Sequence, residues 1–139
     1  MKLANLIIFL FLFVSGVAIA GTSSDKHTGH TMNPEMKRQH KTMATIGKQW
    51  KACRNALNDN NFKDAGIAVE IIIKAAADID NFKLHKNTNN HKQFMEQSSD
   101  FREKIIKLQE VIKAKDADDV DNTVDAVEES CKQCHTKFR

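Results

Sequence analysis

The chain has 139 residues, with 21 Lys and Arg against 18 Asp and Glu, so its formal net charge is +3 at pH 7. It contains no Tyr, a single Pro and five Gly, a composition that suits helices and suits a β-sandwich or barrel poorly. No basic run is interleaved with aromatic residues, so the sequence does not indicate a partner of nucleic acids.

The first 20 residues have the pattern of a secretory signal peptide. The second residue is basic, an uncharged apolar run extends from Leu6 to Val14, and Ala18 and Ala20 form a small-residue cleavage signal. The alternative, a single transmembrane anchor, is disfavoured because the apolar run is short. We therefore expect export to the periplasm, no stable membrane anchor, and a mature chain that begins near Gly21.

The mature chain divides into a short lead-in and one domain. Residues 21–32 are small, polar and aperiodic, so we expect a flexible N-terminal segment. His27 and His30 lie in it; they are solvated on the simplest interpretation and bind a surface metal on the alternative. Hydrophobic periodicity begins after this segment, and residues 33–139 are long enough to bury a core of their own.

Two amphipathic helices are predicted in the first half of the domain. Asn33 suits the cap and Pro34 the first turn of a helix that ends at the turn formers 58–61. Its apolar positions, spaced by seven, three or four residues, are Met36, Met43, Ile46, Trp50, Cys53 and Leu57. A second helix runs from about Phe62 to about Ile79. It is apolar on more than one face, so we expect deep burial or a second interface, such as a homodimer contact.

Two further helices follow a polar connection at residues 80–90. The third carries the apolar positions Phe94, Phe101, Ile105, Leu108 and Ile112. A break at residues 113–119, in which Asp116 suits a cap, precedes the fourth. The stripe of that helix consists of Val120, Val124, Val127, Cys131, Cys134 and Phe138. No strand pattern appears, and four helices with short connections predict an all-α, antiparallel four-helix bundle.

The chain ends in the motif Cys131-x-x-Cys134-His135, which is compatible with three kinds of site. A redox dithiol is disfavoured, because such a pair normally opens a helix after a strand, whereas this one closes the last helix. A structural zinc site normally needs a second pair of ligands, and the remaining cysteine, Cys53, is single. Attachment of a c-type haem explains all three residues, because the thiols bond to the porphyrin vinyl groups and the histidine ligates the iron.

The combination of a four-helix bundle with this motif at its C-terminus resembles the cytochrome c′ family. Three stretches carry the resemblance, and only the last is specific: "RQHKTMATIGKQW", "KQFMEQSSDFREKIIKL" and "VEESCKQCHTKFR". The resemblance implies one covalent haem c held inside the bundle by Cys131 and Cys134, with His135 as proximal iron ligand. It also implies a distal residue from the first helix, at the position of Met43, and a homodimer through the first two helices.

Relatives in this family divide at the position of Met43, and two functions follow. If the thioether ligates iron, the protein is a low-spin electron carrier with redox proteins as partners. If it does not, the iron is five-coordinate and binds nitric oxide or carbon monoxide. The Met-x-x-x-Gly spacing of Met43 and Gly47 looks more like the first group, and a glycine inside a helix lets a flat ring approach. His40 is a competing ligand.

Two other positions bear on the haem. Relatives often have Arg four residues before the distal position, where this chain has Gln39 and places Arg38 one residue earlier. Arg139 matches a basic residue of the family and is a candidate partner for a haem propionate. An enzyme such as a peroxidase is disfavoured, because the only distal base in the first helix would be His40. Cys53 is expected to be a buried thiol, with an intersubunit disulfide as the alternative.

Overall fold

The computed structural model describes residues 33–139; the predicted signal peptide, the lead-in, His27 and His30 lie outside the described residues. Within residues 33–139 the regular structure is helical, without strands. The four α-helices are α1 (Pro34–Asn58), α2 (Phe62–Ala76), α3 (His91–Ala114) and α4 (Ala117–Phe138). Two short 3₁₀ helices, η1 (Ile79–Asn81) and η2 (Thr88–Asn90), lie between α2 and α3. The predicted all-α four-helix bundle is confirmed.

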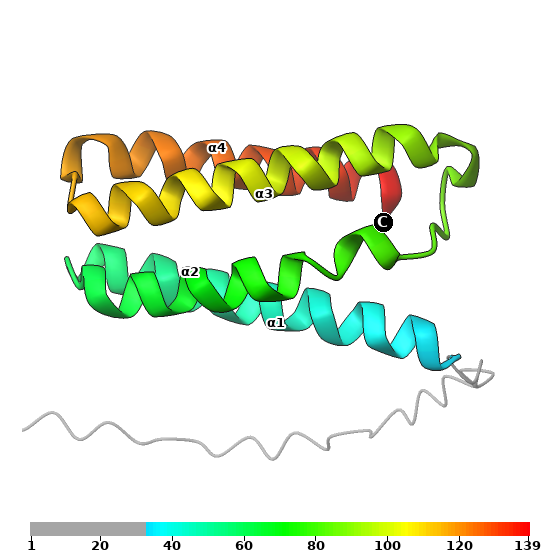
Figure 1. The fold of residues 1–139 in the computed structure, drawn as a ribbon, viewed down its shortest axis with the longest axis horizontal. Helices are drawn as coiled ribbons and strands as arrows, with labels where there is room; N and C mark the ends of the chain where they lie inside the picture. The colour runs from blue at the N-terminus through cyan, green and yellow to red at the C-terminus, as the bar shows by residue number, and fades with distance from the viewer. Residues whose placement is uncertain (1–32) are drawn as a thin grey trace, which may run out of the picture. The chain divides into compact units, whose positions relative to one another are not determined.

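The four helices form two antiparallel pairs (Figure 1). The closest helix pairs are α1 with α2, α2 with α3, and α3 with α4. Helices α1 and α4 also run in opposite directions. Within residues 33–139, their backbones do not approach each other as closely as those of the three pairs just named. No helix among residues 33–139 is long and apolar enough to cross a membrane.

Side-chain caps begin three of the helices. Asn33 accepts a hydrogen bond from the Met36 amide at 2.7 Å, and Pro34 follows at the first helical position, where its missing N–H costs nothing. Asn61 and Asp116 cap α2 and α4 in the same way, with distances of 3.1 and 3.3 Å to the amides three residues on. Each such cap contributes about 1 kcal/mol.

The core follows the predicted stripes. The largest side chains that are fully buried are Ile72, Ile105, Leu108, Val69, Val127 and Cys53. Burying a side chain of this size stabilises the fold by roughly 1.5–3 kcal/mol. On α2, however, Ile67 is 51% and Ile71 36% exposed. This helix is therefore not deeply buried on all sides, which was one of the two expectations for it.

Two helix boundaries differ from the prediction. Helix α2 ends at Ala76, and Ile79 is the first residue of η1, although its side chain is still buried. The break before α4 consists of two residues, since α3 continues to Ala114 and the cap at Asp116 lets α4 begin at once. Lys115, at φ 56°, ends α3 in the left-handed conformation.

A polar cluster fixes η1 to its neighbours. The Asp80 carboxylate accepts a hydrogen bond from the buried Ser98 hydroxyl at 2.8 Å and forms an ion pair with Arg102, both on α3. Burial would raise the pKa of Asp80, but the hydrogen bonds from Arg102 and Ser98 outweigh it and hold this pKa below its usual value. Asp78 makes similar contacts to α1, with Thr42 at 3.2 Å and Arg38 at 3.5 Å. These contacts hold the start of the α2–α3 connection in place.

Candidate functional site

The two cysteines of the C-terminal motif lie on the core-facing side of α4. Cys131 and Cys134 are free thiols, half-buried, and both pack against the hydrophobic core. Residues three apart on a helix share one face, so the two sulfurs point to the same side. One turn on, Phe138 contacts Phe94 of α3 edge-to-face, with ring centroids 5.4 Å apart. That contact holds the end of α4 against α3.

The thiols are poor nucleophiles at neutral pH. Burial, followed by the neighbouring Cys134 and Glu128, raises the pKa of Cys131 to about 11. Burial also raises the pKa of Cys134. A redox dithiol needs the opposite shift, because the thiolate is the reactive form. The environment therefore opposes the dithiol interpretation, as the position at the end of a helix suggested.

His135 is half-buried beside the cysteines. Burial and then the Arg139 guanidinium lower its pKa, so the imidazole is neutral at pH 7. A neutral imidazole is the form that ligates a metal. Arg139 itself is exposed, and its amide donates to the His135 carbonyl oxygen at 3.2 Å. The motif thus offers two aligned thiols and one neutral imidazole on one side of the helix.

One ion pair identifies the side of α1 that faces α4. The Arg54 guanidinium lies 2.8 Å from the Glu128 carboxylate. Going back along α1 from Arg54 in steps of seven and four residues reaches Gly47 and Met43, which therefore lie on the same side of that helix. Met43 is half-buried, and a Cβ added at Gly47 would meet nothing within 4 Å. This side of α1 has room for a flat group against its backbone.

The same ion pair fixes the register of the two antiparallel helices. His135 lies seven residues beyond Glu128 on α4, which places it about 10 Å from the ion pair along the bundle. Gly47 lies seven residues before Arg54 on α1. Because α1 runs in the opposite direction, Gly47 is displaced from the ion pair by the same distance and in the same direction. Gly47 is therefore level with His135, and Met43 lies one turn farther on. The predicted proximal and distal residues thus belong to the two helices whose backbones do not pack closely.

The burial of Gln39, named above at the position where relatives often have Arg, was not predicted from the sequence. This residue is 5% exposed, one turn before Met43 on the same side of α1. Its amide oxygen lies 3.0 Å from His85 Nε2, and its amide nitrogen donates to the Lys83 carbonyl oxygen at 3.4 Å. Gln39 thus ties the α2–α3 connection to α1, at the position where relatives often have Arg. The only available signal was its spacing of four from Met43.

Three other predicted positions are clear in the structure. His40 is exposed, which disfavours it as an internal iron ligand. Cys53 is fully buried, and burial raises its pKa to about 11, so it is a core thiol and not accessible for an intersubunit disulfide. Among residues 33–139, no three His, Cys, Asp or Glu side chains gather in a way that could hold a metal ion.

A comparison with protein families found a match, in the second half of the bundle. The family model described as Cytochrome C' matches residues 84–139, which include α3, α4 and the whole C-terminal motif. Over these residues the chain is similar to the cytochrome c′ family. Neither a curated protein nor a solved structure matched the chain.

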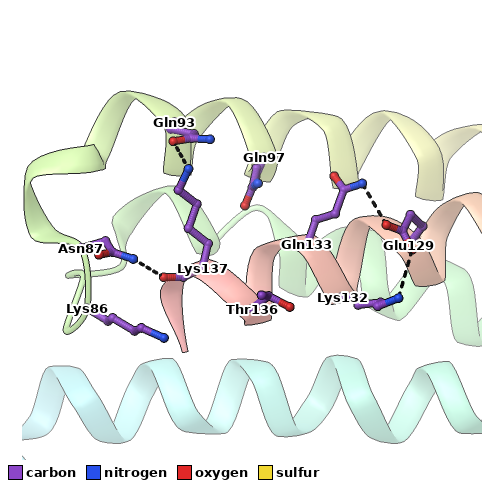
Figure 2. A pocket seen from close by; sticks show the side chains of 9 residues that line it. All are labelled: Lys86, Asn87, Gln93, Gln97, Glu129, Lys132, Gln133, Thr136 and Lys137. Carbon is purple, nitrogen blue, oxygen red and sulfur yellow. Dashed lines mark hydrogen bonds and ion pairs between the residues drawn. The ribbon is translucent and has the colours of Figure 1, made fainter.

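This similarity indicates a c-type haem protein, with haem c bound covalently. The residues fit such a group. The motif offers two protonated, half-buried thiols and a neutral imidazole on one side of α4, and the facing side of α1 has open space at Gly47. The side of α4 that carries the cysteines is not the side that lines the hollow in Figure 2, which lies between α4, α3 and the α2–α3 connection.

Proposed function

We propose that the chain is an exported, monohaem electron carrier. Cys131 and Cys134 hold the haem through thioether bonds, His135 ligates the iron from α4, and Met43 ligates it from α1. The observation that carries the proposal is the register set by Arg54 and Glu128, which brings the Met43–Gly47 turn of α1 to about the level of His135. A haem supplies an iron that takes up and releases one electron, and no substrate is converted.

The protein residues set the properties of that iron. Methionine sulfur is a soft ligand that favours ferrous iron and raises the reduction potential. The half-buried His135 is kept neutral by burial and by Arg139, so ligation needs no loss of a proton near pH 7. Arg139 is also a candidate partner for a propionate. Gln39 holds the α2–α3 connection on α1 next to Met43, which limits the movement of this turn.

A second function, capture of nitric oxide or carbon monoxide, is favoured by one observation. The Met43 side chain packs against the hydrophobic core, as a residue that does not ligate iron would. In that case the iron is five-coordinate and high-spin, and its free position takes the gas.

A spectrum of the ferric protein distinguishes the two functions. Ligation by Met43 predicts a low-spin spectrum with a thioether-to-iron charge-transfer band in the far red, and Met43→Ala should abolish the band and give a high-spin iron that binds nitric oxide rapidly. Met36→Ala is the matched control, because Met36 is also half-buried on α1 but lies two turns away. A high-spin wild type, or a spin state that Met43→Ala leaves unchanged, would rule out this ligation.

The location and oligomeric state are part of the proposal. Export to the periplasm rests on the N-terminal pattern of residues 1–20, and amino-terminal sequencing of the exported protein checks it. The proposal includes a homodimer through α1 and α2, to which the exposed Ile67 and Ile71 would contribute an apolar face of α2. Ile67→Asp should then give a monomer in sedimentation, with the haem spectrum intact.

A further inference from the structure

A polar hollow of about 570 Å³ lies on the outer side of α4, near the C-terminus. Figure 2 shows the side chains around it, which come from α4, α3 and the α2–α3 connection. Three of them are lysines, Lys86, Lys132 and Lys137, and the only acidic group in the lining is Glu129. The remaining lining residues are uncharged and polar. The hollow is therefore a concave surface with an excess of positive charge.

The hollow is held together by contacts between segments that are distant in sequence. The Asn87 amide donates to the Lys137 carbonyl oxygen at 2.6 Å, and the Lys137 ammonium donates to Gln93 of α3. These contacts hold the connection, α3 and the end of α4 together, so the lysines are presented by a formed surface. Lys86 is exposed and forms no ion pair within residues 33–139.

Charge is distributed unevenly along α4. From Ala117 to Glu129 the helix has six acidic residues and no basic one, whereas the stretch from Ser130 to the C-cap Arg139 has three basic residues and no acidic one. Acidic residues suit the start of a helix and basic residues suit its end, because they complement the helix dipole. The dipole accounts for the charges in the first and last turns of α4. It does not account for the acidic residues that continue to Glu129. The end of α4 therefore attracts an acidic surface, and the start of this helix repels it.

We propose that the basic hollow is the docking surface for an acidic protein partner, which exchanges electrons with this chain. The inference rests on the proposed electron-carrier function for the role of the partner, but the docking itself does not depend on it. Complementary charge steers a partner to the correct end, and like charge at the acidic start of α4 disfavours the wrong one. The hollow lies on the helix that carries Cys131, Cys134 and His135, so docking brings the partner close to the haem-binding helix.

The test uses the holoprotein and an oligoglutamate peptide as a surrogate for an acidic protein surface. Fluorescence anisotropy at low ionic strength gives its affinity, and hydrogen exchange read by mass spectrometry locates it. We expect protection at residues 83–90 and 129–139 and an affinity that falls as salt rises. Lys86→Glu with Lys137→Glu should weaken binding of the peptide roughly tenfold or more. Each substitution removes a charge that attracts the acidic peptide and adds one that repels it. Lys86→Glu alone, in a connection rather than a helix, tests the same point if the double variant does not fold.

The matched control is Lys63→Glu with Lys107→Glu, which changes the net charge equally with exposed lysines on α2 and α3 outside the hollow. Its affinity for the peptide should stay within about twofold of that of the wild type. Equal weakening in both double variants, protection elsewhere, or no binding of the peptide would overturn the proposal. Binding to phosphatidylglycerol vesicles without binding to the peptide would also overturn it, in favour of an anionic membrane. Neither measurement depends on spin state, so a high-spin ferric spectrum would refute Met43 ligation and leave this result standing.

Discussion

The substitution Gly47→Ala tests whether haem lies between α1 and α4. Gly47 is inside α1, and a Cβ added there meets no protein atom within 4 Å. Glycine in a helix interior costs roughly 0.5–1 kcal/mol relative to alanine, so the protein atoms alone predict that the substitution stabilises the fold by that amount. A haem plane against this turn would meet the added methyl group. We therefore expect the holoprotein to gain no stability from Gly47→Ala, and its iron ligation to be disturbed.

The measurement is urea unfolding of the holoprotein, followed by helix content and by the haem absorption band, together with the ferric spectrum. Gly66→Ala on α2 is the control, because its Cβ would make an ordinary contact of 3.5 Å with Ile112. That variant should gain roughly 0.5–1 kcal/mol. If Gly47→Ala gains as much as Gly66→Ala and its spectrum is unchanged, then no haem lies against Gly47 and the assignment of the distal side to this turn is wrong.

Three further predictions concern stability and the distal side. Asp80→Asn should lower the free energy of unfolding at pH 7 by about 1 kcal/mol in urea titrations, since the partly exposed ion pair with Arg102 is weakened. The pKa of Asp80 is lowered in the fold, so this contribution is present above the unfolded-state value near 3.8 and should vanish as the pH falls through the folded pKa. Ile105→Ala, at a fully buried position, should cost about 2–5 kcal/mol in the same assay. Gln39→Leu should speed hydrogen exchange around His85, and unchanged exchange there would show that the contact does not hold the connection.

Much of the fold was predictable because its signals are local. The caps at Asn33 and Asp116 and the apolar steps of three and four residues need only neighbouring residues to be recognised. The end of α2 was missed because the stripe continues through Ile79, which is buried although it lies in η1. After Ala76 the chain leaves the helix, and Asp78 contacts α1 while Asp80 contacts α3. These partners are distant in sequence, so a local pattern cannot reveal them.

From the residues alone the candidate site was predictable on one helix only, and the prediction of Met43 on α1 came from the family resemblance. Cys131, Cys134 and His135 lie in one short motif, and their shared face follows from helical spacing. The partner side on α1 required the register between two helices that are far apart in sequence, which the ion pair of Arg54 with Glu128 sets. The burial of Gln39 was missed for a related reason, because it depends on the connection that covers this residue.

Charge separation changes what net charge alone suggests about association. With a predicted mature chain and two ionised haem propionates, the formal charge is near zero, so long-range attraction to any one partner is weak. The lysines around the hollow and the acids of the first half of α4 nevertheless lie at opposite ends of one helix. These separated charges orient a partner with an acidic face before contact, although the net attraction between the two proteins is weak. Orientation is what a carrier with a single redox centre needs, because only encounters near the haem transfer an electron.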